Sequence, residues 1–299
     1  IGDGANDVPM ILGGNVGIGV RGKEGAAAVQ VCDVAISQFR FLVPLLLCHG
    51  RRAYRRVAVF FCYYLYKNIA LLVADLVWMH WDNFDGNIAF AEYLSIAYNA
   101  FFTSWHILFV LGFDRDVPDE VALQHPSLYK IGTSNKLFNA WVFSSWMVDA
   151  LVHGIVAWLV PFHMIGTSDW HSQQFWVSST CAFANVVHIC LLKLVIVSQN
   201  PVSMTTLLPT LGAWLMFVFY LWGLCYTSLG WSVQPNMKYI FEEMFATTGA
   251  VTTLIISPPI ALLINVAARI IQRYVFPDEL QRIEMKLRDN RVSPGDGDM

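Results

Sequence analysis

The chain carries little charge. Asp, Glu, Lys and Arg make up 14% of its 299 residues, whereas 56% are hydrophobic. Soluble domains carry charged residues at about a quarter of their positions, so this composition excludes the ordinary soluble class. The formal net charge is −3, and the lack of a basic excess argues against a nucleic acid as a partner. We therefore expect a membrane protein that binds no nucleic acid.

The cysteines show no pairing pattern. None of the six belongs to a C-x-x-C pair or falls clearly in a predicted outer loop, and the chain has no Asn-x-Ser/Thr sequon. We interpret the cysteines as reduced thiols that fill the core. The chain does not begin with Met, and its first residue lies inside a motif. We therefore expect it to be the later part of a longer protein.

Long apolar runs determine the predicted fold. An α-helix of about 20 apolar residues crosses the ~30 Å hydrocarbon core of a bilayer, and the sequence has six such runs. We place them at residues 57–79, 93–112, 138–162, 175–198, 206–228 and 246–271. The basic segment 41–56 is expected to form a stalk helix before the first run, and residues 272–299 a cytoplasmic tail.

Lys and Arg are almost absent from one side of this predicted bundle. Sixteen of the 19 precede the first span, lie between the second and third spans, or lie at the end of the last span and beyond it, and Lys238 alone lies on the opposite side. Because basic loops stay in the cytoplasm, we expect both ends of the chain and the loop near residues 113–136 to be cytoplasmic.

Two carboxylates and an amide crowd into one glycine-punctuated loop at the start of the chain. The glycines let the backbone turn tightly enough to bring Asp3, Asn6 and Asp7 to one side. Mg²⁺ takes one or two carboxylates while it keeps several waters and a phosphate. An isolated turn of this composition is more commonly a solvated loop, and the membrane segments that follow are what favour a magnesium and phosphate site.

Short helices and strands are predicted to alternate through residues 1–40. Helices are expected at residues 8–12 and 23–31, and short strands at residues 16–20 and 33–36. This alternation is typical of a doubly wound α/β sheet.

The first span places a full charge inside the membrane. Lys67 and Asn68 lie near its middle, and the second span carries Asn99, with Thr103 and Ser104 one turn further on. An ionisable side chain in a span costs at least about 2.5–3.5 kcal/mol on insertion scales and marks a functional site by default. The alternative is that Lys67 only binds a carbonyl or carboxylate of a neighbouring helix.

Several ordered blocks of the sequence resemble one family. They are Gly2-Asp3-Gly4-Ala5-Asn6-Asp7-Val8-Pro9-Met10-Ile11, Gly17-Ile18-Gly19-Val20 through Lys23-Glu24-Gly25, Asp33-Val34-Ala35-Ile36-Ser37-Gln38-Phe39-Arg40-Phe41-Leu42, Leu47-Cys48-His49-Gly50-Arg51, Tyr66-Lys67-Asn68, Tyr98-Asn99 with Phe102-Thr103-Ser104, Phe113-Asp114-Arg115-Asp116-Val117 and Pro126-Ser127-Leu128-Tyr129. Together they resemble the carboxy-terminal third of the type IV P-type ATPases, the phospholipid-transporting ATPases or flippases. The resemblance covers nearly the whole chain, although the last three spans match only in hydropathy and length.

The resemblance implies a fold and a reaction. The fold would be mainly α, a six-helix transmembrane bundle preceded by the carboxy-terminal piece of an α/β, haloacid-dehalogenase-like phosphorylation domain in residues 1–40. The reaction would be ATP-driven translocation of phospholipid from the outer to the cytoplasmic leaflet through an aspartyl-phosphate cycle. The phosphorylated Asp would lie upstream, so the resemblance implies no catalytic residue here and no activity of this chain alone.

The resemblance also implies roles for particular residues. Asp3 and Asp7 would hold Mg²⁺, while Asn6 and Asp7 would contact the phosphate or nucleotide of ATP. The residues that would line the path of a phospholipid head group are Lys67, Asn68 and Asn99. A small two-span β-subunit is the partner that the family implies.

Two other functions remain as alternatives. A cation-transporting P-type ATPase would need carboxylates at mid-depth in the first two spans, where the sequence has Lys67 instead. A non-enzymatic scaffold, or pseudoenzyme, would be expected to lose the acidic loop. One departure concerns the second span, where Trp105-His106 stands at the position of a proline in many relatives. We therefore expect this helix to lack the proline kink.

Overall fold

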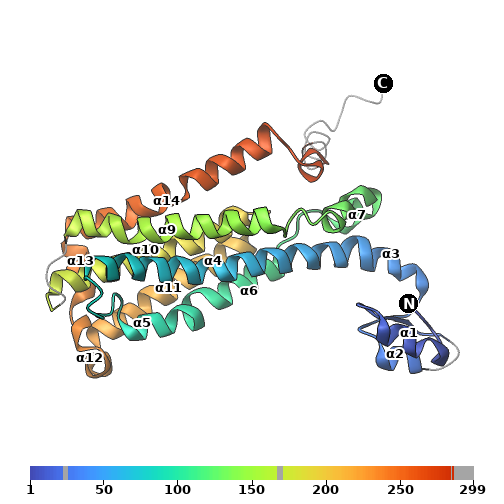
Figure 1. Cartoon of the computed structure of the whole chain (residues 1–299), viewed down its shortest axis with the longest axis horizontal. Helices are drawn as coiled ribbons and strands as arrows, with labels where there is room; N and C mark the ends of the chain where they lie inside the picture. Colours follow the sequence, from blue (N-terminus) through green and yellow to red (C-terminus); the bar gives the residue numbers. More distant parts are fainter. Residues whose placement is uncertain (23–25, 167–170, 284, 286–299) are drawn as a thin grey trace. The chain divides into compact units, whose positions relative to one another are not determined.

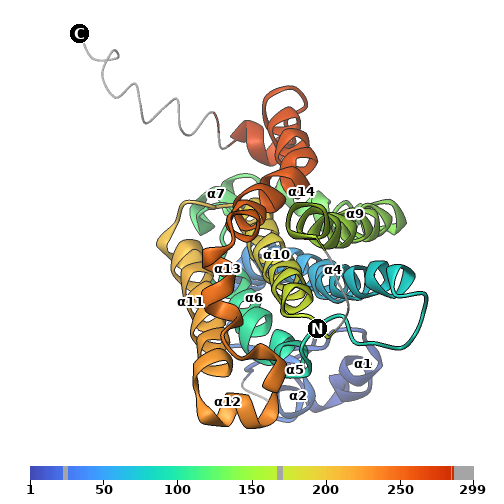
Figure 2. The same ribbon diagram turned by 90° about the vertical axis from the view of Figure 1, so that its left-hand side faces the viewer.

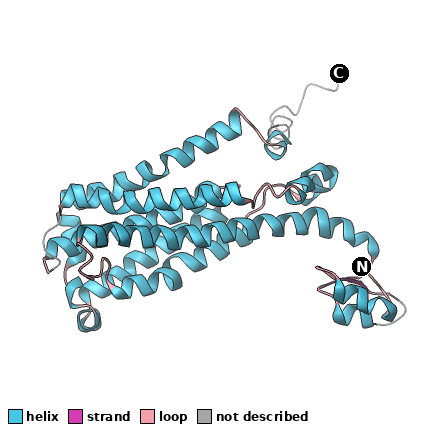
Figure 3. Cartoon of the chain, in the orientation of Figure 1, coloured by secondary structure: helices cyan, strands magenta, loops and turns pink. Residues whose placement is uncertain are grey.

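The computed structural model describes residues 1–22, 26–166, 171–283 and 285. This part of the chain is mainly helical, with two short strands near its beginning (Figure 3). It divides into two compact units, Ile1–Arg55 with Val117–Lys136 and Arg56–Asp116 with Leu137–Met299, which we describe separately. Of the predicted tail, residue 284 and residues 286–299 lie outside the described residues.

A two-stranded parallel sheet lies in the first unit. β1 (Ile18–Val20) pairs with β2 (Val34–Ile36), and α2 (Ala27–Val31) connects them. The turn η1 (Ala5–Asp7) and α1 (Val8–Gly13) precede the sheet. A strand is present in each predicted segment, and both are shorter than predicted. Of the helix expected at 23–31, residues 23–25 lie outside the described residues.

Helical turns make up the rest of the first unit. The turn η2 (Phe39–Phe41), α3 (Leu42–Pro44) and the π-helical turn η3 (Leu45–Gly50) lead into α4 (Arg51–Trp81). The loop segment holds α7 (Asp119–Gln124), η5 (Pro126–Tyr129) and α8 (Lys130–Thr133). Arg52 forms an ion pair with Asp119, and the Cys48 thiol lies 3.7 Å from the Asp119 carbonyl oxygen. These contacts attach the loop to the helical segment.

Six helices in the described part of the chain are long and apolar enough to cross a membrane, which confirms the predicted number. They are Phe39–Trp81, Glu92–Phe113, Ala140–Ile165, Gln173–Val197, Met204–Tyr226 and Thr248–Tyr274. The second of these combines α5 (Glu92–Ala97), the π-helical turn η4 (Tyr98–Thr103) and α6 (Ser104–Phe113). The next four are α9, α10, α11 and α14, and the short elements α12 (Ser228–Val233), η6 (Pro235–Met237) and α13 (Ile240–Ala246) lie between the last two.

Helix α10 lies at the centre of the second unit. It packs against α9, α11 and α14 (Figure 2), and α4, α9 and α10 run side by side in Figure 1. Its most apolar stretch is 72% buried, against 22% for the stretches in α11 and α14. A helix that is apolar on every side belongs in a core, whereas the outer helices keep an apolar face that suits lipid.

Candidate functional site

The acidic loop at the start of the chain folds around the side chain of Asp7. Its Oδ2 atom accepts hydrogen bonds from the main-chain N–H groups of Asp3 at 3.0 Å and Gly4 at 3.2 Å. Gly2 lies beside this carboxylate, and a Cβ atom placed on Gly2 would come within 2.3 Å of the Asp7 Cβ atom. The backbone therefore fixes Asp7, and only glycine fits next to it.

The loop leaves carboxylate oxygens available for a ligand. Asp3 and Asn6 are exposed and Asp7 is half-buried, and the contacts with the loop use one of the two Asp7 oxygens. In the described residues, no three His, Cys, Asp or Glu side chains gather as a metal cage. Two carboxylates are enough for Mg²⁺, which completes its shell with waters and phosphate oxygens. The residue types fit this ion.

Lys67 in α4 forms the centre of a second site. Its ammonium nitrogen donates hydrogen bonds to Asn99 Oδ1 at 2.5 Å and to Thr103 Oγ1 at 2.8 Å. It also lies 5.4 Å and 5.3 Å from the ring centres of Tyr64 and Tyr98. Lys67 is 0% exposed, and across the described residues neither hydrogen-bond partner is a carboxylate. Neutral oxygens and aromatic faces stabilise an ammonium group without cancelling its charge.

The three residues predicted to line one path do not share one environment. Asn99 is exposed while its amide oxygen holds Lys67, so it lies where the buried charge meets the surface. Asn68 is half-buried and donates to the main-chain carbonyl of Tyr64 in its own helix at 2.9 Å. The structure therefore brings Lys67 and Asn99 together and gives Asn68 a different partner.

A π-helical turn supplies both oxygen atoms that bind Lys67. Asn99 and Thr103 belong to η4, and the Thr103 hydroxyl donates to the Tyr98 carbonyl five residues earlier at 2.8 Å. Such wide turns occur often at functional sites. The helix thus has an irregular turn without a proline, and the lack of a proline kink expected from Trp105-His106 stays a prediction. His106 is fully buried in α6, and its Nε2 atom lies 2.9 Å from Thr210 Oγ1 in α11.

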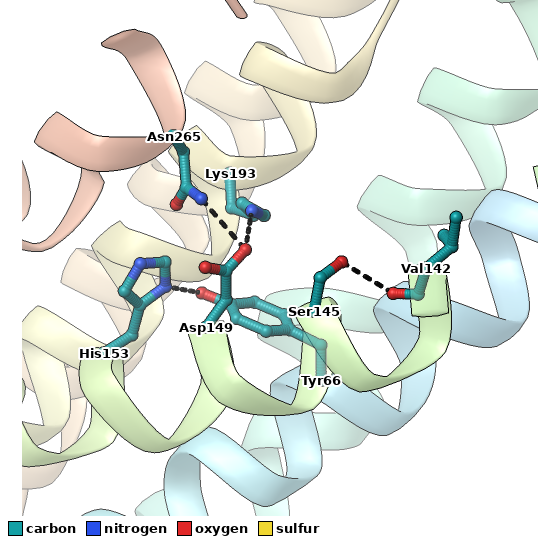
Figure 4. A network of polar contacts seen from close by, with 7 residues as sticks. All are labelled: Tyr66, Val142, Ser145, Asp149, His153, Lys193 and Asn265. Atoms are coloured by element: carbon teal, nitrogen blue, oxygen red, sulfur yellow. Dashed lines mark hydrogen bonds and ion pairs between the residues drawn. The ribbon is translucent and has the colours of Figure 1, made fainter. Parts of the chain in front are cut away.

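The second lysine within the spans is paired with a carboxylate. Lys193 in α10 lies 2.6 Å from Asp149 Oδ2 in α9, and the Asn265 amide in α14 donates to the same oxygen at 2.9 Å (Figure 4). Nearby, the Tyr66 hydroxyl and His153 Nδ1 are 2.6 Å apart. These contacts make Asp149, His153 and Lys193 partners between helices, a common role of polar residues in membrane spans.

The sequence alone indicates no role for some polar residues of these helices. Tyr98 matters through its hydroxyl, which donates to the Lys67 carbonyl at 2.9 Å, although a tyrosine in a span is usually an interface or core residue. Asn185 and Ser257 join α10 to α14 through a 3.0 Å hydrogen bond, but each is a single polar residue in an apolar run. An α-helical periodicity also gives no indication of the π-helical turn η4.

Comparison with known proteins identifies the family. Residues 29–278 match the family described as phospholipid-translocating P-type ATPase C-terminal. A phospholipid-transporting ATPase of Schizosaccharomyces pombe is 30% identical over 290 residues, 95% of this chain and 23% of that protein. The human phospholipid-transporting ATPase ID is 31% identical over 270 residues, 88% of this chain and 21% of that protein.

A third relative is similar to a shorter part of the chain. The phospholipid-transporting ATPase DRS2 of Saccharomyces cerevisiae is 36% identical over 159 residues, 53% of this chain and 12% of that protein. The chain spans less than a quarter of the length of each of these relatives. Six apolar helices and these relatives together indicate an integral, multi-pass membrane protein. The chain therefore belongs to the family of phospholipid-translocating P-type ATPase C-terminal regions.

Proposed function

We propose that this chain is the carboxy-terminal part of an ATPase that moves phospholipid from the outer to the cytoplasmic leaflet through an aspartyl phosphate. The similarity to proteins named phospholipid-transporting ATPases over 95% of the chain supports this function. The observation that carries it is the buried charge of Lys67, whose described hydrogen-bond partners are both neutral.

The Lys67 site suits an anionic group. A positive charge at low dielectric attracts a phosphate or carboxylate strongly, and Asn99 offers an exposed amide beside it. A lipid head group that passes Asn99 would replace its hydrogen bonds to water with contacts to the Asn99 amide and the Lys67 ammonium group. A cation pump would need carboxylates at this depth, and in the described part of the chain the oxygens on Lys67 come from an amide and a hydroxyl. We therefore favour lipid over a metal cation as the cargo.

The acidic loop would serve phosphoryl transfer. Asp3 and Asp7 would hold Mg²⁺, which supplies charge neutralisation when bound, and Asn6 and Asp7 would contact the phosphate or nucleotide of ATP. The parallel β1–α2–β2 arrangement supports the assignment of residues 1–40 to the end of a haloacid-dehalogenase-like phosphorylation domain. The phosphorylated Asp would be upstream, so this chain alone would neither hydrolyse ATP nor move lipid.

The same proposal implies a membrane topology and a partner subunit. Both ends of the chain and the loop after the second span would be cytoplasmic, which the distribution of Lys and Arg supports. A small two-span β-subunit would contact the outer loops and the last spans. Exposed apolar side chains in those loops support such a contact, among them Phe84 at 70% and Leu229 at 73% exposure.

The test is lipid-stimulated ATP hydrolysis by the full-length protein that contains this chain. Asp3→Asn is expected to abolish turnover with every phospholipid, because it weakens Mg²⁺ binding. Lys67→Ala is expected mainly to raise the phospholipid concentration that gives half-maximal stimulation. Equal loss of basal turnover and lipid response in both variants would contradict these separate roles. Stimulation by a metal cation in place of phospholipid would favour a cation pump, and no hydrolysis under any condition would favour a pseudoenzyme.

A further inference from the structure

Lys67 and Tyr98 are joined by a closed ring of hydrogen bonds. The Lys67 ammonium donates to Thr103 Oγ1 at 2.8 Å, and the Thr103 hydroxyl donates to the Tyr98 main-chain carbonyl at 2.8 Å. The Tyr98 hydroxyl completes the ring by donating to the Lys67 main-chain carbonyl at 2.9 Å. Each hydroxyl has one proton, and each proton has one acceptor in this ring. All three residues are 0% exposed, so water does not compete for these bonds.

The ring determines the direction of the Lys67 side chain. A free lysine side chain samples many rotamers, and fixing it costs roughly 1.5–2 kcal/mol in conformational entropy. Here the Tyr98 hydroxyl fixes the backbone at Lys67, and the Tyr98 ring lies 5.3 Å from the ammonium nitrogen. The ammonium group is thereby directed toward Asn99, the exposed residue of the site.

A third helix, α10, contacts the Tyr98 hydroxyl. The Cys190 thiol of α10 lies 3.4 Å from the Tyr98 hydroxyl oxygen. Because the tyrosine proton is used on the Lys67 carbonyl, the thiol is the donor in this weaker contact. Cys190 and Tyr98 are both fully buried, so neither can touch a passing lipid.

We propose that Tyr98 is a positioning residue for lipid recognition, one that acts through Lys67. This inference rests on the proposed function, since it requires that Lys67 contacts the head group. It goes beyond that function because Tyr98 reaches no surface and its effect must pass through the orientation of the ammonium group. Loss of the hydroxyl removes the bond to the Lys67 backbone and so loosens the ring, while the Lys67 charge and its bonds to Asn99 and Thr103 remain.

Tyr63 provides a matched control for the Tyr98 hydroxyl. Its hydroxyl donates to the Cys190 main-chain carbonyl, also at 2.9 Å, and Tyr63 is also 0% exposed. Tyr63→Phe and Tyr98→Phe each remove one buried bond from a hydroxyl to a carbonyl between helices. Two differences remain: only the Tyr98 bond ends on the backbone of Lys67, and only Tyr98→Phe also removes the weak contact with the Cys190 thiol.

The experiment measures ATP hydrolysis by the purified full-length protein in vesicles of phosphatidylcholine with increasing phosphatidylserine or phosphatidylethanolamine. Tyr98→Phe is expected to raise the half-maximal lipid concentration roughly two- to tenfold, the effect of one net hydrogen bond, with maximal turnover retained. Tyr63→Phe is expected to change it less than about twofold. In a Lys67→Ala background, Tyr98→Phe is expected to add nothing, because the two act as one unit.

The outcomes separate this inference from the proposed function. Equal effects of Tyr98→Phe and Tyr63→Phe, or an additive effect in the Lys67→Ala background, would overturn the positioning role alone. A Lys67→Ala variant with unchanged lipid dependence would overturn both proposals. If Tyr98→Phe does not fold, Thr103→Val against Thr103→Ser tests the same ring. Serine keeps the hydroxyl and should retain the lipid dependence, whereas an equal response of both variants would overturn the ring's role.

Discussion

The Asp149 carboxylate lies 2.6 Å from the Lys193 ammonium nitrogen and thereby connects α9 to α10. The same carboxylate oxygen accepts a hydrogen bond from Asn265, so α14 joins the pair (Figure 4). Lys67 differs because its described hydrogen-bond partners are neutral. The two intramembrane lysines therefore have different chemistry: the charge of Lys193 is matched, and that of Lys67 is available to another group.

Asp149→Asn is expected to lower the free energy of unfolding of the second unit. It leaves the buried Lys193 charge unmatched, and the side chain of Lys193 is only 6% exposed. Removing one partner of a buried pair costs about 3–5 kcal/mol, which we reduce to roughly 1–3 kcal/mol because the Asp149 side chain is 25% exposed. Thermal unfolding of the full-length protein in detergent measures the loss. Lys238→Met is the control, since Lys238 is exposed and stacks over Trp231.

The double substitution Asp149→Leu with Lys193→Met sharpens this prediction. Removing both charges avoids an unmatched buried charge, so the double variant should unfold at a higher temperature than Asp149→Asn. An Asp149→Asn variant as stable as the Lys238→Met control would contradict the importance of the pair.

Much of the helical architecture could be predicted from the sequence because the bilayer sets the length of apolar runs. The run predicted at residues 175–198 is α10 (Gln173–Val197), and that at 138–162 is α9 (Ala140–Ile165). Asn139 and Ser172 accept bonds from main-chain N–H groups and begin these two helices, as N-cap residues do. At these positions the N-cap residues and the apolar runs predict the same helix starts.

The site was only partly predictable, because side-chain direction depends on local backbone geometry. A straight α-helix places Asn99 and Thr103 on one face, which the sequence indicated. It gives no reason for the Thr103 hydroxyl to reach the Tyr98 carbonyl five residues earlier, which happens in the π-helical turn η4. Asn68 follows Lys67 directly, but adjacent residues of a helix point about 100° apart, and Asn68 bonds to its own helix.

Asn99→Ala and Asn68→Ala are expected to affect lipid recognition differently. Asn99 is exposed and accepts a hydrogen bond from the buried Lys67 ammonium group, so its truncation should raise the half-maximal lipid concentration roughly three- to tenfold. Within the described part of the chain, Asn68 donates to the Tyr64 carbonyl alone, so its truncation should change that concentration less than about twofold. Lipid titrations of ATP hydrolysis by the two variants make the comparison. A larger effect of Asn68→Ala would show that Asn68 lies on the lipid path after all.

Gly154→Ala is expected to separate two helices of the bundle. A Cβ atom at Gly154 in α9 would lie 2.5 Å from the Ala70 carbonyl oxygen and 2.8 Å from the Val73 Cβ atom in α4. Both contacts are too short, and overpacking of this kind costs about 1–3 kcal/mol. Gly112→Ala in α6 is the control, since a Cβ atom there meets nothing within 4 Å. Thermal unfolding should distinguish the variants, and equal stability would show that α9 and α4 can move apart freely.

Gly2→Ala is expected to disable the acidic loop while lipid recognition persists. The added methyl group would overlap the Asp7 Cβ atom at 2.3 Å, so the Asp7 carboxylate must move from the N–H groups that hold it. A displacement of about 1 Å at a positioning group costs on the order of 100-fold in rate, and we expect at least a tenfold loss of maximal ATP turnover. The half-maximal lipid concentration should stay near that of the wild type, since Lys67 is unchanged.

Gly13→Ala, where a Cβ atom meets nothing within 4 Å, is the control for a methyl group added to the same unit. If the maximal turnover of Gly2→Ala and Gly13→Ala agrees within about twofold, the loop tolerates the shift of Asp7. That result would contradict the claim that ATP turnover needs Asp7 in its observed position.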